Sequence, residues 1–159
     1  MSSSLQDNAQ QVIRTGGFDL PCDAVTAFPL FSPEGERDWV PGWNPVPVFP
    51  ETIAFRANTV FRLGQGSDES VWTILEADWQ TRRAEYVRTA PASHTARIGV
   101  KIEPVAPNHS RVTVSYAVTA FGEHASAVLE PFSESAYAQR MRDWQQQIST
   151  CLEGHHYAS

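Results

Sequence analysis

Five segments between residues 59 and 121 alternate apolar and polar residues, and this pattern constrains the fold more than any other feature of the chain. They are Thr59–Leu63, Ser70–Trp79, Arg82–Thr89, Thr95–Glu103 and Arg111–Phe121. A period of two residues is typical of strands with one buried face. The turn-forming residues between the segments are too few to hold a crossover helix, so a parallel sheet is excluded. The sequence therefore predicts an antiparallel sheet.

The N-terminal third predicts one more strand and two short helices. The strand ends at Leu20, and Gly16-Gly17 predicts a kink or a bulge within it. Asp23 is a suitable N-cap for the first helix, and Ser32-Pro33-Glu34 is a start signal for the second. The proline-rich segment 41–50 cannot be a central strand, because proline lacks the amide donor of the ladder. An extended edge or a loop is expected there.

One long amphipathic helix is predicted near the C-terminus. Its apolar residues recur at steps of three and four, and they are Phe132, Ala136, Tyr137, Met141, Trp144, Ile148, Cys151 and Leu152. From Phe132 to Leu152 the helix would be roughly 30 Å long, and Gly154 is predicted to end it. Such a helix lies across the concave face of a twisted sheet without filling it. The remaining space is a natural ligand cavity.

The length of 159 residues suits a single domain. The expected organisation is a polar lead over residues 1–10, one domain over 11–153 and a tail over 154–159. Hydrophobic residues make up 42% of the chain, which is typical of a packed globule. Aromatic residues make up 11%, enough for a core with rings left over for a cavity.

The charge pattern argues against several classes of partner. The net charge is −6 and the chain has no basic run, which argues against nucleic-acid binding. No apolar run reaches the roughly 20 residues that a bilayer span requires, so no membrane insertion is expected. The polar start contains no signal peptide, which predicts a cytoplasmic protein. Cys22 and Cys151 are too far apart in the sequence to indicate a disulfide scaffold.

Three segments resemble a known superfamily. They are Phe31–Pro45 (FSPEGERDWVPGWNP), Val114–Ala120 (VSYAVTA) and Met141–Trp144 (MRDW). Together with the order of elements, they resemble the START/Bet v 1-like helix-grip superfamily (SRPBCC), and within it the polyketide cyclase/dehydrase and lipid-transport-like group. The resemblance implies an α+β helix-grip fold with a hydrophobic cavity. That fold is a curved antiparallel sheet of about six or seven strands wrapped around a long C-terminal helix, with two short helices after the first strand. Because the superfamily hosts binders, carriers, cyclases and chaperone cofactors, no reaction follows from it.

The inward faces of the predicted elements supply the candidate ligand contacts. Tyr86 is predicted to point inward and to bring Ala84 and Arg88 to the same face. The full set of predicted ligand-binding residues is Trp72, Ile74, Tyr86, Ile98, Val100, Val114, Tyr116, Tyr137, Met141 and Trp144. Trp39 and Trp43 are either a lid at the cavity mouth or a plug that closes the core beneath the short helices. For each apolar position, plain core packing is the alternative.

Candidate acid–base groups are few, and no catalytic residue is assigned. Glu76 and Asp78 would face inward if they shared the face of Trp72; the alternative is that they are solvated near the strand end. Glu34, Glu36 and Arg37 are expected to be structural, stabilising the helix dipole and forming either a local ion pair or a tie to the sheet. The five histidines are not spaced like a zinc motif, so no metal and no cofactor are predicted.

Three functions fit these observations. The first is the binding of a small, mostly apolar molecule between the sheet and the C-terminal helix. The second is a cofactor-independent enzyme of the cyclase/dehydratase type, which needs titratable groups within reach of a bound carbonyl chain. The third is a protein-interaction module resembling chaperone ATPase activators, which requires a filled core and a large exposed apolar patch. The protein partner of such a module is not indicated by the sequence.

Overall fold

The computed structural model describes residues 9–158 and contains one antiparallel sheet, one long helix and several short helical turns. The strands are β1 (Gln10–Leu20), β2 (Val46–Phe49), β3 (Val60–Leu63), β4 (Ser70–Asp78), β5 (Arg83–Ala90), β6 (His94–Ala106) and β7 (His109–Ala120). The α-helices are α2 (Ala24–Ala27), α3 (Ala125–Leu129) and α4 (Glu134–Ala158). The 3₁₀ turns are η1 (Phe28–Phe31), η2 (Gly35–Asp38), η3 (Gly66–Asp68) and η4 (Glu130–Phe132).

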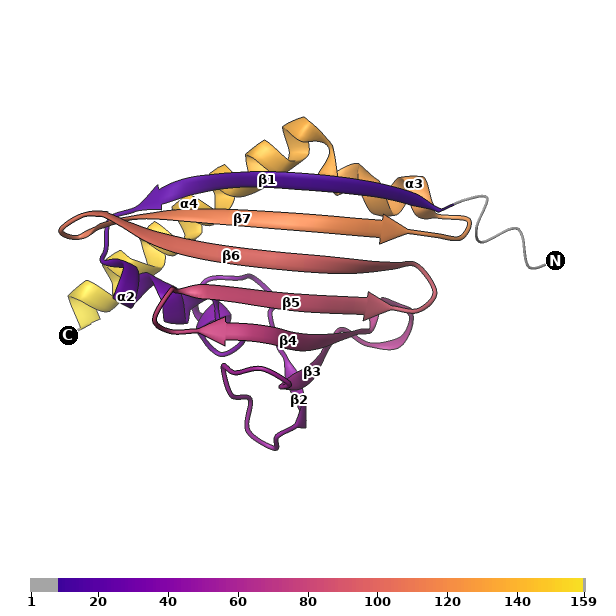
Figure 1. Ribbon diagram of the computed structural model, residues 1–159, viewed down its shortest axis with the longest axis horizontal. Helices are drawn as coiled ribbons and strands as arrows, with labels where there is room; N and C mark the ends of the chain where they lie inside the picture. Colours follow the sequence, from indigo (N-terminus) through magenta and orange to yellow (C-terminus); the bar gives the residue numbers. More distant parts are fainter. Residues whose placement is uncertain (1–8, 159) are drawn as a thin grey trace.

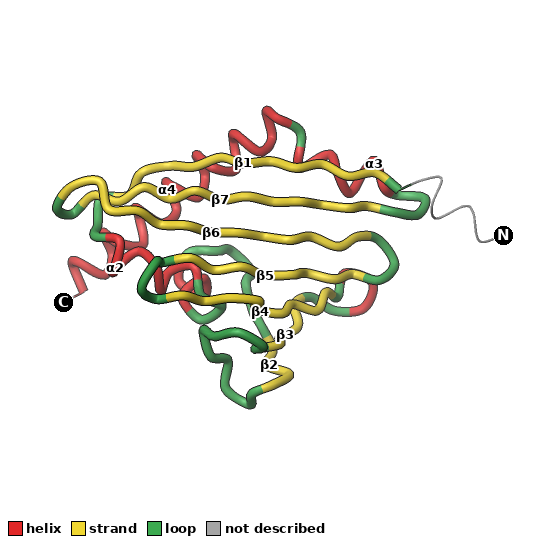
Figure 2. The backbone as a smooth tube through the Cα atoms, viewed as in Figure 1, coloured by secondary structure: helices red, strands yellow, loops and turns green. Residues whose placement is uncertain are grey.

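The seven strands lie in the order β1-β7-β6-β5-β4-β3-β2, and every neighbouring pair is antiparallel. The sheet is curved, and α4 crosses behind it (Figure 1). The short helical turns that follow β1 lie on the same side as α4 (Figure 2). The antiparallel sheet, the long C-terminal helix and the two short helical segments after the first strand confirm the predicted fold class. The proline-rich segment provides the edge strand β2, as expected.

Alternation of side chains divides the sheet into a buried face and an outer face. On β7, Val112, Val114, Tyr116 and Val118 are buried and the residues between them are more exposed. A register shift after Ile74 changes the parity of β4. Beyond the shift Ala77 packs against the core and Glu76 is exposed. This irregularity is the reason that Glu76 does not share the face of Trp72.

Two local predictions, at Gly16-Gly17 and at Gly154, differ from the structure. Of the kink or bulge predicted at Gly16-Gly17, the bulge is absent, because β1 pairs with β7 in unbroken register from Gln10 to Leu20. Instead, a Cβ at Gly16 would lie 3.0 Å from Met141 and 3.1 Å from Tyr137, so the glycine lets α4 approach the strand closely. Gly154 does not end α4, which continues to Ala158. Gly154 has no positive φ, and a glycine inside a helix costs only about 1 kcal/mol relative to alanine.

The N-cap prediction for Asp23 is right in position but not in mechanism. Asp23 occupies the N-cap of α2, yet its side chain makes no capping hydrogen bond. Its Oδ1 accepts a hydrogen bond of 2.8 Å from the backbone N–H of Asn108 instead. The carboxylate therefore ties the start of α2 to the turn between β6 and β7. The predicted lead over residues 1–10 falls mostly outside the described residues.

Candidate functional site

A cavity of about 250 Å³ lies between the sheet, η2 with the loop after it, and α4. It is lined by Glu36, Val40, Trp43, Leu63, Ser70, Trp72, Tyr86, Arg88, Ile98, Val100, Tyr116 and Trp144. The strands β3 to β7 form its floor, and Trp144 reaches it from α4. Seven of the residues that the sequence predicts for the site line this cavity: Trp43, Trp72, Tyr86, Ile98, Val100, Tyr116 and Trp144.

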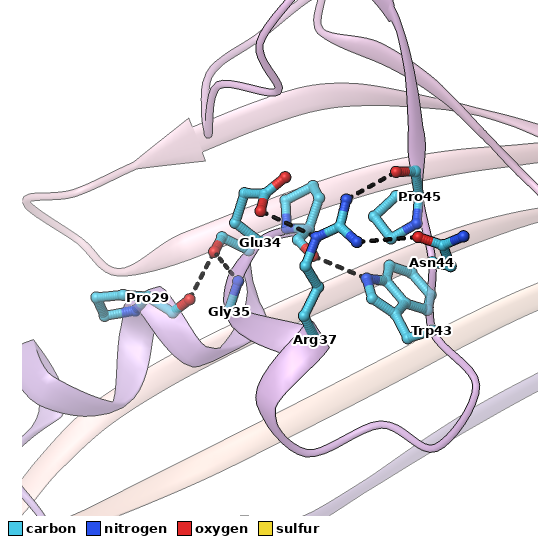
Figure 3. Close-up of polar contacts among 9 residues, drawn as sticks. Pro29, Glu34, Gly35, Arg37, Trp43, Asn44 and Pro45 are labelled. Carbon is cyan, nitrogen blue, oxygen red and sulfur yellow. Dashed lines mark hydrogen bonds and ion pairs between the residues drawn. The ribbon is translucent and has the colours of Figure 1, made fainter. Parts of the chain in front are cut away.

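The segment 32–45, which contains η2, places two side chains against the cavity. Its start is fixed by Ser32, whose Oγ accepts a hydrogen bond of 2.9 Å from the Gly35 N–H and donates one of 2.6 Å to the Pro29 carbonyl (Figure 3). This is a local capping arrangement, because the hydroxyl satisfies a backbone donor that the short turn leaves free. The capped turn sets the direction of the chain that carries Glu36.

Arg37 holds the end of the same segment. Its guanidinium donates to Glu34 Oε2 at 2.9 Å, to Asn44 Oδ1 at 3.1 Å and to the Pro45 carbonyl at 2.8 Å (Figure 3). Trp43 is fixed as well, because its indole Nε1 donates to the Pro33 carbonyl at 2.8 Å. The Glu34–Arg37 ion pair confirms the structural role predicted for these two residues.

Aromatic rings form one wall of the cavity. Trp72 lies at its centre. Its ring stacks on the Phe61 ring with 5.6 Å between the centroids, and it meets the Trp43 ring edge to face with 5.5 Å between the centroids. Tyr86 meets Trp72 edge to face at 6.1 Å. The indole Nε1 of Trp72 donates to Ser70 Oγ at 2.9 Å, so its polar edge is already paired. These contacts leave the wall apolar, as a site for a hydrophobic ring requires.

The two cavity tyrosines differ in how their hydroxyls are satisfied. Tyr86 donates to the Phe31 carbonyl at 2.6 Å, and burial together with the nearby Glu36 raises the pKa of its phenol. Burial also raises the pKa of Tyr116, while the positive charges of Arg88 and Arg140 oppose that rise. The Tyr86 hydroxyl is therefore already satisfied by a backbone carbonyl, whereas the Tyr116 hydroxyl lies near the positive charges of Arg88 and Arg140.

Glu36 is a cavity residue that the sequence assigned to a structural role. It is half-buried and lines the cavity, and burial raises the pKa of its carboxyl well above the ordinary value of 4.5. Its neighbours Glu34 and Arg37 point into their own ion pair instead. The sequence signal was weak, because three charged residues in a four-residue turn do not show which one faces inward.

Arg88 brings a positive charge to the same cavity. Its guanidinium carbon lies 5.3 Å from the centre of the Trp72 ring, and burial lowers the pKa of the guanidinium. The buried Nε has no hydrogen-bond partner in the described part of the chain. The alternation of side chains along β5 predicted that Arg88 shares the inward face with Tyr86, and it does. The sequence did not predict a function for Arg88.

The carboxylates that the sequence considered for acid–base chemistry lie elsewhere. Glu76 is exposed on the outer face. Asp78 Oδ1 accepts hydrogen bonds from the backbone N–H groups of Gln80 at 2.9 Å and Thr81 at 3.2 Å, and these lower the pKa of the carboxyl. The solvated alternative is confirmed for both residues.

Four predicted contacts are buried but do not line the cavity. Ile74 and Val114 belong to the packed core. The Tyr137 hydroxyl donates to the Val114 carbonyl at 2.6 Å, and burial raises the pKa of the phenol. Tyr137 and Met141 line a separate open groove of about 710 Å³ between β1 and α4. Of the three ligand contacts predicted on α4, Trp144 is therefore the one that lines the cavity.

Trp39 and Trp43 divide between the two predicted roles. Trp39 does not line the cavity; its ring lies 5.7 Å from Phe31 and 5.4 Å from Trp144, and its Nε1 donates to the Leu30 carbonyl at 2.7 Å. It packs as the plug beneath the short helical turns. Trp43 lines the cavity, half-buried, and remains the candidate for the mouth.

Among the described side chains, which exclude those of Ser67 and residues 155–158, no group of three or more His, Cys, Asp or Glu is placed to hold a metal ion. None of the helices within residues 9–158 is long and apolar enough to cross a bilayer.

Comparison with known proteins rests on structure. No protein-family model and no curated protein sequence matches the chain. Norcoclaurine synthase from Thalictrum flavum, solved with dopamine and hydroxybenzaldehyde, is similar with a TM-score of 0.63 and 13% identity over 94% of this chain and 91% of that one. An uncharacterized protein from Rhizobium leguminosarum has a TM-score of 0.65 and 14% identity over 91% and 96%. Ara h 8.0201 has a TM-score of 0.60 and 16% identity over 94% and 100%. The chain has the helix-grip fold of the START/Bet v 1-like superfamily.

Proposed function

We propose that the protein binds a small, mostly hydrophobic molecule in the cavity between the sheet, the segment 32–45 and α4. The single observation that carries the proposal is the cavity itself, which remains open although aromatic side chains surround it. The space of about 250 Å³ is partly open to solvent, which gives a small molecule a path of entry, and concave spaces with mostly apolar linings are the usual sites of small ligands. At about 30 Å³ per water molecule, this volume corresponds to roughly eight waters or one small bicyclic ligand.

The chemistry of the lining supports an apolar ring as the main part of the ligand. Trp72, Trp43 and Trp144 offer flat faces and edges from three different elements. The open cavity also disfavours the interaction module, which requires a filled core. A solved neighbour with this fold, norcoclaurine synthase, holds dopamine and hydroxybenzaldehyde, both of which contain one aromatic ring. The proposed ligand contacts are the seven predicted residues of the lining together with Glu36, Val40, Leu63, Ser70 and Arg88.

A neutral bicyclic probe tests the proposal directly. We expect 2-naphthamide to bind with one-to-one stoichiometry in isothermal titration calorimetry and to quench tryptophan fluorescence. Val40→Trp, which places a large ring in the lining, should weaken this binding about tenfold or more. Val25→Trp is the matched control, because Val25 is 74% exposed and does not line the cavity. Equal binding by both variants, or no binding by the wild type, would overturn the proposal.

Glu36 favours a second candidate, cofactor-independent acid–base catalysis on a bound carbonyl compound. A carboxyl whose pKa burial raises toward neutrality can donate a proton to a carbonyl oxygen below that pKa and accept a proton from the α-carbon above it. The test is exchange of the α-hydrogens of 2-tetralone for deuterium in D₂O, followed by NMR. Enzymatic exchange that Glu36→Gln abolishes, with 2-tetralone still bound, supports this candidate. Exchange at the uncatalysed rate in the wild type rejects it.

A further inference from the structure

Arg88 is a half-buried cation for which the described side chains supply no anion. Its Nε is buried without a hydrogen-bond partner, and none of the ion pairs among the described side chains, those of residues 9–154 other than Ser67, involves Arg88. Guanidinium stays protonated at every physiological pH, so the group cannot escape the cost of burial by losing its proton. The Trp72 ring, whose centre lies 5.3 Å from the guanidinium carbon, stabilises the cation from one side only. The Nε–H donor of Arg88 therefore lacks an acceptor among the described residues.

Two groups near Arg88, His94 and Arg140, are basic. Burial and the positive charge of Arg88 lower the pKa of His94. Arg140, whose guanidinium carbon lies 5.6 Å from the centre of the Tyr116 ring, acts with Arg88 to lower the pKa of Tyr116, whereas burial and the charge of Glu36 raise it. Glu36 is the acidic side chain that lines the same cavity.

Glu36, the acidic side chain of the lining, does not balance this charge. It forms no ion pair of 4 Å or less with Arg88. Burial favours its neutral form, as the raised pKa of its carboxyl records. The lining thus combines an apolar wall with a cation and a carboxyl that forms no ion pair with it.

We propose that the ligand is an amphipathic organic acid whose ring lies against Trp72 and Trp43 and whose carboxylate binds the guanidinium of Arg88. This inference rests on the proposed binding function and names the chemical class of its ligand. A carboxylate fits better than a phosphate, because its single charge and two oxygens match one guanidinium fork. The Tyr116 hydroxyl lies in the same positive field and lines the same cavity, so it is placed to donate to the second oxygen.

The experiment compares two probes of nearly equal shape, 2-naphthoate and neutral 2-naphthamide, by calorimetry at neutral pH. We expect the wild type to prefer naphthoate about tenfold or more, since hydrogen bonds to charged groups are the stronger class. Arg88→Met keeps the length and apolar stem of the side chain and should remove this preference while still binding naphthamide. Arg83→Met on the same strand is the matched control, because Arg83 is exposed and does not line the cavity. It should keep the wild-type preference.

The outcomes separate this inference from the function on which it rests. Equal affinity of the wild type for the two probes, or an unchanged preference in Arg88→Met, overturns the organic-acid assignment and leaves the binding function intact. Binding of neither probe overturns both. If Arg88→Met fails to fold, Arg88→Lys gives the answer: it keeps the charge but not the planar fork, and we expect a reduced preference for naphthoate. An unaltered preference in Arg88→Lys contradicts the bidentate contact.

Discussion

Two regions of the sheet differ in how closely the covering helix and loop pack against them. In the filled region, formed by β1, β7 and the part of α4 over them, the helix approaches the sheet closely, and the groove of about 710 Å³ between β1 and α4 is a surface groove open to solvent. The Tyr137 hydroxyl of α4 bonds to the Val114 carbonyl at 2.6 Å, and Gly16 leaves room for the helix. In the cavity region, formed by β3 to β6, Tyr116 of β7 and the segment 32–45, the sheet and its cover do not close, and about 250 Å³ remains.

The difference lies in the residues at the contact. A glycine without a side chain lets a helix approach a strand, whereas tryptophan rings that meet edge to face hold their elements apart. Trp43 and Trp72 make such a contact, with their ring planes at 84°. Unmet hydrogen bonding does not follow this division, because the buried Ser110 Oγ on β7 lacks a hydrogen-bond partner in the described part of the chain, as does Arg88 Nε in the cavity region. Packing is therefore what separates the two regions.

The largest expected effect comes from one substitution made at two positions on β6. Ile102 is fully buried and pairs with Val112 of β7, whereas Ile98 lines the cavity. Ile102→Ala should lower the free energy of unfolding by about 2–5 kcal/mol, because it opens a void in packed surroundings. Ile98→Ala should cost about 2 kcal/mol, the lower end of that range, because part of its surface already faces empty space. Urea denaturation measures both, and equal costs would contradict the division into two regions.

The pH dependence of stability tests the buried carboxyl of the cavity region. Because burial raises the pKa of Glu36 in the folded protein, the unfolded chain loses this proton at a lower pH than the folded one. Stability is therefore highest below the ordinary value of 4.5 and falls as the pH rises from there through the raised pKa. Glu36→Gln should flatten this fall, as measured by thermal unfolding from pH 4 to pH 8.

Asp19 supplies a control of opposite sign from the filled region. Hydrogen bonds from His109 and Arg111 lower the pKa of its carboxyl. The stability from Asp19 is thus present above the ordinary value of 3.8 and is lost as the pH falls through the lowered pKa. Asp19→Asn should change the profile below pH 4 and leave the fall at higher pH in place. A Glu36→Gln profile parallel to the wild type would show that the carboxyl is not perturbed.

Strand periodicity and helical spacing were sufficient to predict the sheet, the long helix and the inward set on β6 and β7. The pattern failed where a single irregular residue decided the outcome, as after Ile74, where a register shift turned Glu76 outward. The pattern also failed in η2. There the hydrogen bonds of Ser32 and Arg37 fix the turn that places Glu36 at the cavity, and no sequence periodicity indicates this placement. The tryptophans were predicted as a pair, and only tertiary packing separates Trp39 from Trp43.

The smallest expected effect distinguishes two tyrosines on opposite sides of the division. Tyr137→Phe removes the buried hydrogen bond to the Val114 carbonyl, so it should cost about 1 kcal/mol of unfolding free energy. Tyr116→Phe removes a hydroxyl that lines the cavity, and its effect on stability should stay within about 0.5 kcal/mol. The affinity for 2-naphthoate should change in the reverse order: Tyr116→Phe should lower it more than Tyr137→Phe does. If Tyr137→Phe weakens naphthoate binding more than Tyr116→Phe does, the ligand occupies the groove between β1 and α4, and the assignment of the site to the cavity is wrong.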